Sequence, residues 1–170
     1  MRAQAPFDIN GVVEPGIIAT KNALDHDANV LVLGTNATIT SKAYETLLKE
    51  HGFNNTTAKA TGLFVPIIEE GLFSGEVLNS TMEHYFKDLD HPDGIILGCT
   101  HFPPIADAVA EYFNDNVTLI HSGEAIVEYL ESQYEFKEKH PAPEIKFFAS
   151  ENPEALRRTA HQWLDLPAEK

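Results

Sequence analysis

Two short apolar runs constrain the fold of this chain more than any other feature. One covers residues 29–34, with Val30 to Leu33 uninterrupted by a polar residue, and the other covers residues 94–97. Such runs, without polar alternation, are typical of strands that are covered on both faces. Longer amphipathic stretches lie between the apolar runs. This alternation predicts an α/β fold with a parallel sheet flanked by helices.

The same periodicity assigns the remaining elements. Strands are expected at 9–13, 29–34, 56–60, 94–97, 117–120 and 145–149, the first of them ended by Glu14-Pro15-Gly16. Helices are expected at 17–24, 41–51, 79–89, 104–113, 122–130 and 153–164, with a loop and a short helix at 64–71 that Gly71 ends. Ser122 is expected to cap its helix. Residues 133–144 are charged and contain prolines, which indicates a connector.

Composition excludes several classes of partner. The 170 residues carry a formal net charge of −14, which argues against nucleic acid and anionic membranes as partners. The sequence has no apolar run of 18 residues and no apolar segment near its start, so neither a membrane span nor a signal peptide is expected. A single cysteine excludes an intramolecular disulfide, and a free thiol favours the cytoplasm.

That cysteine, Cys99, follows the second apolar run and precedes Thr100 and His101. The carboxyl ends of parallel strands are where α/β folds bind ligands. A helix N-terminus and a histidine nearby lower the pKa of a thiol from its usual value of about 8.5. The thiolate is then a nucleophile or a proton-abstracting base. The alternative is a small buried hydrophobe without a chemical role.

A second candidate site is the hydroxyl-rich segment 35–41, which follows the first apolar run. Hydroxyls such as those of Thr35 and Thr38, with free backbone N–H groups, can hold a carboxylate or a phosphate. The alternative is helix capping by Thr40 or Ser41. The segment lacks the glycines and the lysine of a phosphate loop, so nucleotide binding is not expected.

Two further sets of polar residues carry weaker signals. Glu69 and Glu70 are adjacent, so at most one of them can face a site from a helix. The histidines lack the spacing of metal ligands, and no metal site is expected.

The segment Gly98-Cys99-Thr100-His101-Phe102-Pro103 closely resembles the second cysteine motif of glutamate racemases, which belong to the cofactor-independent aspartate/glutamate racemase superfamily. Residues 11–16, 34–39 with 41–44, and 64–71 resemble other blocks of that family in the same order. The tail 147–164 is similar to its last strand and helix.

The resemblance implies a two-base mechanism without pyridoxal phosphate, metal or any other cofactor. Two thiols flank the α-carbon of glutamate; one thiolate removes the proton and the other thiol returns one from the opposite face. Cys99 would be one of these bases, His101 would assist its proton transfer, and Glu69 would be the acid near that histidine. Thr100, Thr35 and Thr38 would bind the substrate. The intact enzyme would supply D-glutamate for peptidoglycan in the cytoplasm and would be a homo-oligomer.

The departures from the family determine what this chain can do. The resemblance places residues 1–120 in the second lobe and residues 121–170 in a tail that completes the first lobe. The first cysteine motif and the Asp-Ser-Gly loop of the family are not in the sequence, and His121 stands where the family usually has Asp. We therefore expect a racemase fragment that is inactive alone, with exposed apolar surface on the tail and a tendency to dimerise.

Two other functions remain as alternatives. One is a non-catalytic lobe that binds glutamate or a partner protein. The other is a thiol hydrolase that uses Cys99 and His101; it is disfavoured by the expectation that residues so close in sequence are poorly placed for mutual hydrogen bonding.

Overall fold

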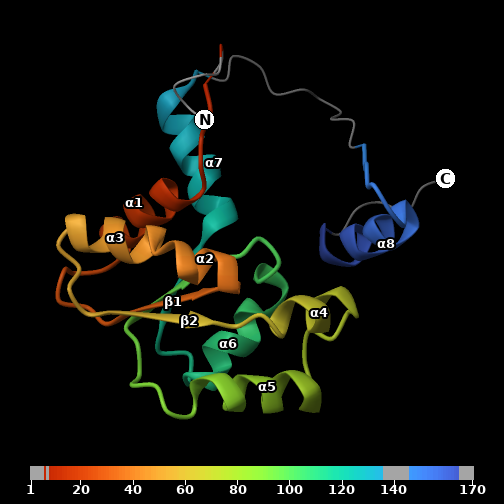
Figure 1. Cartoon of the computed structure of the whole chain (residues 1–170), viewed down its shortest axis with the longest axis horizontal. Helices are drawn as coiled ribbons and strands as arrows, with labels where there is room; N and C mark the ends of the chain where they lie inside the picture. Colours follow the sequence, from red (N-terminus) through yellow and green to blue (C-terminus); the bar gives the residue numbers. More distant parts are fainter. Residues whose placement is uncertain (1–5, 7, 136–145, 165–170) are drawn as a thin grey trace.

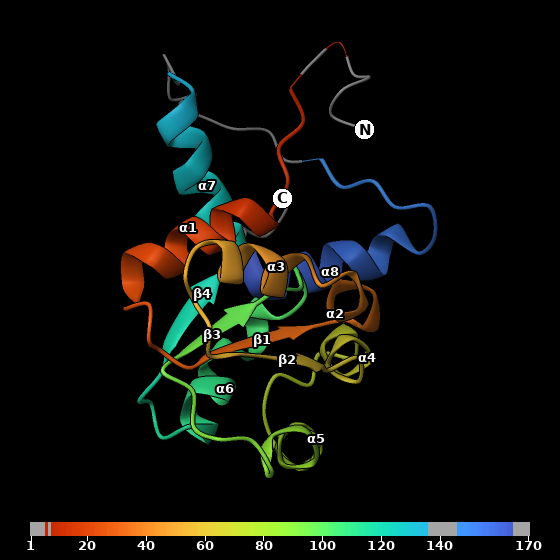
Figure 2. The ribbon, with the colours of Figure 1, turned by 60° about the vertical axis from the view of Figure 1, so that its left-hand side comes forward.

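The computed structural model describes residues 6, 8–135 and 146–164. Within these ranges the chain forms one parallel sheet of four strands in the order β2-β1-β3-β4, which Figure 2 displays. The strands are β1 (Val30–Gly34), β2 (Thr56–Ala60), β3 (Gly94–Leu97) and β4 (Thr118–His121). The predicted class, a parallel sheet flanked by helices, is confirmed.

Helices cover both faces of the sheet (Figure 1). One face carries α1 (Val13–Ala23), α3 (Ala43–Glu50) and α7 (Ser122–Gln133), and α1 packs against α7. The other face carries α4 (Phe64–Glu69), α5 (Glu76–Phe86), a 3₁₀ turn (Pro103–Ile105) and α6 (Ala106–Tyr112). The short helix α2 (Asn36–Ser41) follows β1, and α8 (Pro153–Leu164) lies to one side of the body in Figure 1.

The central strands send alternate side chains into two separate cores. Leu31, Leu33, Ile95 and Leu97 face the α4–α5–α6 side, where they pack with four buried phenylalanines and other apolar residues. Val30, Val32 and Ile96 face α1 and α3. Because all of these side chains are buried, the apolar runs contain no polar position.

The register brings several strand ends to one edge of the sheet. Leu33 of β1 is paired with Leu97 of β3, and Leu97 is paired with His121 of β4. The segments that follow β1 and β3, which contain Thr35 and Cys99, therefore begin side by side at this edge.

Most of the expected elements are present. The strands at 29–34, 56–60, 94–97 and 117–120 are confirmed, as are the helices near 17–24, 64–71, 79–89, 104–113, 122–130 and 153–164, with shifts of a few residues at some ends. Gly71 follows the end of α4 with a φ of 76°. The helix expected at 41–51 is α3, which begins only after Lys42 (φ 54°), while residues 36–41 form the unexpected α2.

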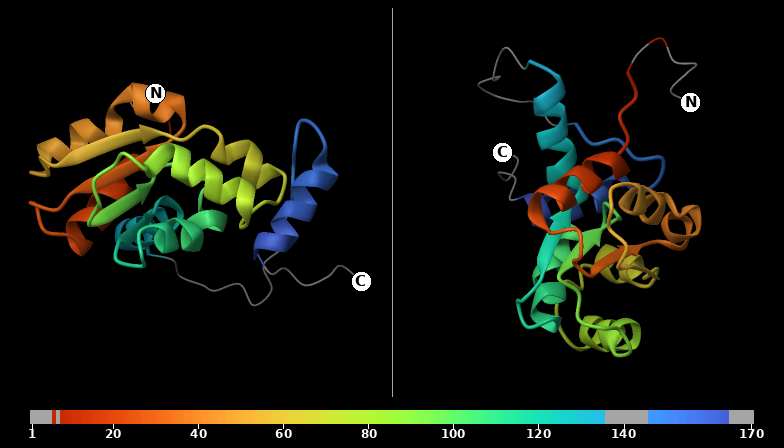
Figure 3. Two further views of the ribbon diagram at one scale, coloured as in Figure 1. Left: turned by 90° about the horizontal axis from the view of Figure 1, so that it is seen from below. Right: turned by 90° about the vertical axis from the view of Figure 1, so that its left-hand side faces the viewer.

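The strand expected at 9–13 is wrong. Asp8 to Val12 is irregular and runs beside α7 rather than beside a strand (Figure 3). The Asn10 amide donates to the hydroxyl of Tyr134 at 3.2 Å, and that hydroxyl donates to Asp8 at 3.2 Å. Without a neighbouring strand, this segment has no partner for a hydrogen-bond ladder. Pro15, expected to end the strand, lies in the first turn of α1, where its missing N–H costs no helical hydrogen bond.

Two expectations in the C-terminal part also differ from the structure. Residues 146–149 form no strand, since they lead to α8 away from the sheet; Ile145 and most of the 133–144 connector lie outside the described residues. Ser122 does not cap α7, because its hydroxyl donates to the carbonyl oxygen of Leu97 at 2.9 Å. No helix in the described ranges combines the length and apolar character needed to cross a membrane.

Candidate functional site

Gly98 determines where the segment after β3 can run. Its N–H donates to the carbonyl oxygen of Leu33 at 2.9 Å. A Cβ atom built on Gly98 would lie 2.8 Å from that oxygen and 3.1 Å from Cε2 of Tyr44. Only glycine tolerates this approach, and the tight packing fixes the backbone immediately before Cys99.

The residues after Cys99 are held by the core. The N–H of Phe102 donates to the carbonyl oxygen of Cys99 at 3.1 Å, and the Phe102 side chain is fully buried beside Phe64. Thr100 lies at the exposed turn between them. Cys99 itself is half-buried, so it is neither fully enclosed in the core nor fully exposed to solvent.

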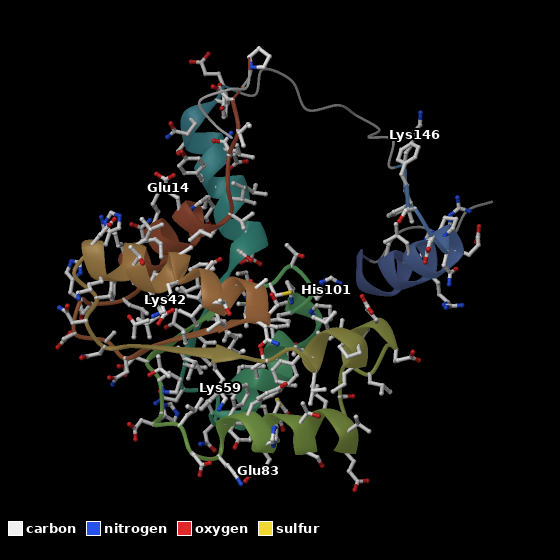
Figure 4. The ribbon with its side chains drawn as sticks, in the orientation of Figure 1. Glu14, Lys42, Lys59, Glu83, His101 and Lys146 are labelled. Atoms are coloured by element: carbon white, nitrogen blue, oxygen red, sulfur yellow. The ribbon has the colours of Figure 1, made fainter. Side chains whose placement is uncertain are left out.

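Cys99, His101 and Glu69 form a chain of contacts at this edge. The sulfur of Cys99 lies 3.8 Å from Nδ1 of His101, and Nε2 of His101 lies 3.4 Å from Oε1 of Glu69. The side chains of His101 and Glu69 are 43% and 61% exposed. Figure 4 shows His101 at the end of the sheet near α2 and α4. A carboxylate that orients an imidazole beside a thiol is an arrangement suited to proton transfer.

This geometry corrects one expectation and supports another. The expectation that Cys99 and His101 are poorly placed for a mutual hydrogen bond is wrong, because the turn at Thr100 brings both side chains to the same side. Of the two adjacent acids, Glu69 faces the imidazole and Glu70 is exposed at the end of α4.

The hydroxyls of Thr35 and Thr38 lie at the start of α2, beside the end of β1. Thr35 is the N-cap of α2; its oxygen accepts from the N–H of Thr38 at 3.4 Å and lies 3.2 Å from the Thr38 hydroxyl. Thr35 therefore caps α2, whereas the cap expected from Thr40 or Ser41 belonged to the next helix, α3, whose N-cap is Lys42 without a side-chain bond. Ser41 instead accepts from the N–H of Ala43 at the start of α3, at 3.3 Å.

At this edge, sequence reasoning assigned no role to Thr61 or Tyr44, and it assigned Ser122 only the role of a helix cap. Thr61 and Ser122 are buried and tie the ends of β2 and β4 to β1 and β3: the N–H of Thr61 donates to the carbonyl oxygen of Gly34 at 2.8 Å, and Ser122 contacts Leu97. The hydrogen bonds of Thr61 and Ser122 join segments that are far apart in the sequence, so no local sequence pattern predicts them.

Tyr44 is the third residue missed. It is 3% exposed, and its spacing of four from the buried Leu48 was the available signal for a core position. Burial raises the pKa of Tyr44 to about 12, with a further contribution from the nearby charge of Cys99. Within the described ranges, no three potential ligands among His, Cys, Asp and Glu come together as a metal site.

Comparison with known proteins identifies the family. The model of the Asp/Glu/Hydantoin racemase family matches residues 1–130. A glutamate racemase from a Nitratiruptor species is 56% identical over 165 residues, which cover 96% of this chain and 65% of that protein. This chain thus spans about two thirds of the length of that relative.

Solved structures give the same result. The crystal structure of glutamate racemase from Campylobacter jejuni subsp. jejuni has a TM-score of 0.93 at 45% identity, over 99% of this chain and 68% of that one. Glutamate racemase from Francisella tularensis subsp. tularensis, solved in complex with D-glutamate, has a TM-score of 0.72 at 27% identity, over 93% and 60% of the two chains. The chain therefore belongs to the glutamate racemase family.

Proposed function

We propose that this chain contributes one of the two thiol bases of a cofactor-independent glutamate racemase. The observation that carries the proposal is the contact chain from Cys99 through His101 to Glu69, at the carboxyl end of a central parallel strand. Cys99 removes the α-proton of one enantiomer as a thiolate and returns a proton to the same face, as a thiol, in the reverse direction. His101 passes protons to and from the sulfur, and Glu69 orients the imidazole.

The substrate is held without a cluster of cations. Thr35, Thr38 and Thr100 lie around the same edge of the sheet and bind glutamate through hydroxyl or backbone groups. The hydroxyls of Thr35 and Thr38 are already held together by their mutual contact, which reduces the entropy lost on binding. The bound complex of the Francisella relative with D-glutamate supports this choice of ligand.

The 170-residue chain alone does not racemise glutamate at a useful rate. Inversion at the α-carbon needs a proton taken from one face and another delivered to the opposite face, and the sequence has one cysteine. Residues 1–120 supply the lobe that carries Cys99, and residues 121–170 belong with the lobe that carries the second base. With that lobe present, we propose that the enzyme acts in the cytoplasm as a homo-oligomer and supplies D-glutamate for peptidoglycan.

The experiment is complementation with the missing part of the site. The chain is co-expressed with the part of the Nitratiruptor racemase that it does not match, and circular dichroism follows the loss of optical activity of L-glutamate and of D-glutamate. We expect no racemisation by the chain alone, racemisation by the complex, and loss of that activity in Cys99→Ser. Ser132→Ala, on the exposed end of α7, is the matched control that keeps activity.

Two results would contradict the proposal: racemisation by the chain alone, or activity of the complex that survives Cys99→Ser. Binding of glutamate by the complex without racemisation would instead favour a non-catalytic binding lobe. The contact between Cys99 and His101 is also compatible with a thiol hydrolase, which would be detected as a covalent acyl-enzyme at Cys99. Family membership favours the racemase.

A further inference from the structure

An asparagine followed directly by a glycine lies in the exposed segment that leads into α1. Asn10-Gly11 is the only Asn-Gly pair in the sequence. Both residues are exposed, and residues 8–11 belong to no helix or strand. The segment runs beside the end of α7 in Figure 1. Its backbone is therefore not held by a helix or a strand ladder, and it can change conformation without unfolding an element.

This pair has the chemistry of a spontaneous modification site. The backbone nitrogen of Gly11 attacks Cγ of the Asn10 side chain, and the side-chain nitrogen leaves as ammonia with the proton of the Gly11 N–H. The product is a succinimide ring, which water opens at either of its two carbonyl carbons. One opening gives aspartate, and the other gives isoaspartate, in which the main chain runs through the side-chain carbon. Glycine favours the attack because it has no side chain in the way and its backbone is permissive.

In the unmodified chain, the amide of Asn10 helps to hold this segment against α7. Its Nδ2 donates to the hydroxyl of Tyr134 at 3.2 Å, and that hydroxyl donates to Oδ2 of Asp8 at 3.2 Å. The hydroxyl therefore uses its acceptor and its single proton on two residues that lie 124 and 126 positions away in the sequence. Because Tyr134 is the C-cap residue of α7, the two bonds tie residues 8–10 to the end of that helix.

We propose that Asn10-Gly11 is a deamidation site, and that its product releases residues 8–12 from the end of α7. A carboxylate at position 10 has no proton to donate, so the bond from position 10 to the Tyr134 oxygen is lost. The one proton of that hydroxyl then serves only one of two neighbouring carboxylates, at positions 8 and 10, and these like charges repel each other. The isoaspartate product also adds a carbon to the main chain. Deamidation thus replaces a tie with a repulsion.

The first test measures the reaction by mass spectrometry. The full chain is incubated at 37 °C and neutral pH and is then cleaved after lysine and arginine. The peptide of residues 3–21 contains Asn10 as its only asparagine, and fragment ions distinguish it from Gln4. We expect Asn10 to deamidate at least about tenfold faster than Asn79, which precedes a serine inside α5, because that helix must open before its backbone can attack.

Gly11→Ala is the matched variant, because it keeps the amide of Asn10 and hinders the attacking nitrogen. Deamidation at position 10 should slow in this variant by about tenfold. The proposal would be overturned if Asn10 were as stable as Asn79 in the wild-type chain, or if Gly11→Ala left the rate at position 10 unchanged.

The second test measures the consequence in the folded chain. Asn10→Asp supplies the aspartate product uniformly, and hydrogen exchange is followed in the last turn of α7, where the N–H of Tyr134 donates to the carbonyl oxygen of Leu130 at 2.9 Å. We expect exchange there to be about three- to tenfold faster, the factor that the loss of one hydrogen bond gives. Tyr134→Phe, which lacks the shared hydroxyl, should show the same acceleration. Asn79→Asp, which adds the same charge on α5, should show none.

An Asn10→Asp variant that exchanges like the wild type would overturn the release of the segment. Exchange accelerated equally by Asn79→Asp would also overturn it, because net charge would then be the cause. Neither test uses racemase activity, so the proposed function can fail or succeed separately.

Discussion

The hydroxyl of Ser122 donates a 2.9 Å hydrogen bond to the carbonyl oxygen of Leu97 and so joins the start of α7 to the end of β3. Both residues are buried, with exposed fractions of 3% and 0%. Leu97 is separated from Cys99 only by Gly98, which itself bonds to Leu33 of the neighbouring strand. The position of the thiol therefore depends on contacts with β1 and α7 as well as on its own strand.

Ser122→Ala tests this connection. The substitution leaves a buried carbonyl oxygen without its side-chain donor, and we expect a loss of about 1–3 kcal/mol in the free energy of unfolding, measured in urea. In Ser132→Ala the lost hydroxyl is exposed and contacts Tyr129 within the same helix, so the expected change is below about 0.5 kcal/mol. Equal free energies of unfolding for the two variants would show that the hydrogen bond from Ser122 does not stabilise the fold.

Gly98→Ala tests the close approach beneath the thiol. The new methyl group would lie 2.8 Å from the Leu33 carbonyl oxygen, a backbone atom of a central strand that cannot move aside. We expect a loss of stability of about 1–3 kcal/mol, together with a changed rate of Cys99 alkylation. Gly62→Ala is the control, because no heavy atom lies within 4 Å of the added Cβ and its φ is ordinary. A Gly98→Ala variant as stable as Gly62→Ala would contradict the packing described for this edge.

The two central strands, β1 and β3, could be predicted from the sequence because burial on both faces leaves no polar residue in them. The runs at 30–33 and 94–97 have this property. The hydroxyls and the thiol that follow these runs lie, as expected, at the sheet edge where both strands end. The segments 9–13 and 145–149 are also rich in apolar residues, but a strand needs in addition a neighbour with free backbone groups, which depends on the tertiary fold. For the same reason the pattern could not distinguish a cap at Ser122 from a bond to a distant carbonyl.

The geometry of the site was only partly accessible from the sequence. The family resemblance brought Cys99, His101 and Glu69 into one hypothesis. The contact between Cys99 and His101, however, depends on the turn at Thr100, which the resemblance did not specify. Tyr44 belongs to a segment that resembles a block of the family, but the sequence assigned it no role beyond a helical core position. Its closeness to Gly98, the residue before Cys99, is a tertiary contact between residues 54 positions apart.

The stability of the chain should fall in alkaline solution because of Tyr44. Its pKa is about 12 in the folded chain and 10 in the unfolded chain, so the neutral phenol is favoured by folding. This contribution is fully present below pH 10 and is lost as the pH rises from 10 to 12; two pKa units correspond to about 3 kcal/mol. Urea unfolding at pH 8 and pH 11 should show a smaller difference for Tyr44→Phe than for wild type. An equal loss in both would assign the alkaline instability to other groups.

Glu69→Gln distinguishes an effect on the rate of racemisation from an effect on the stability of the fold. Because the ion pair with His101 is exposed, we expect the free energy of unfolding to change by less than about 0.5 kcal/mol. In the complemented enzyme, however, the imidazole loses its orienting carboxylate, and the rate of racemisation should fall by about tenfold or more. Glu70→Gln, one residue along the chain, is the matched control and should keep full activity. If both variants retain activity, Glu69 has no part in proton transfer.

Exposed apolar side chains beyond residue 120 predict self-association of the isolated chain. Val127, Tyr134, Phe148 and Leu156 are 54%, 38%, 83% and 40% exposed in the segment that we propose to be a tail. Such surface favours association, so light scattering coupled to size exclusion should detect a dimer whose fraction rises with concentration. The double variant Val127→Ser with Phe148→Ser should shift the chain towards monomer, while Val77→Ser, equally exposed on α5, should leave the equilibrium unchanged. A wild-type chain that remains a monomer at all concentrations, without binding an apolar dye, would contradict this account of the tail.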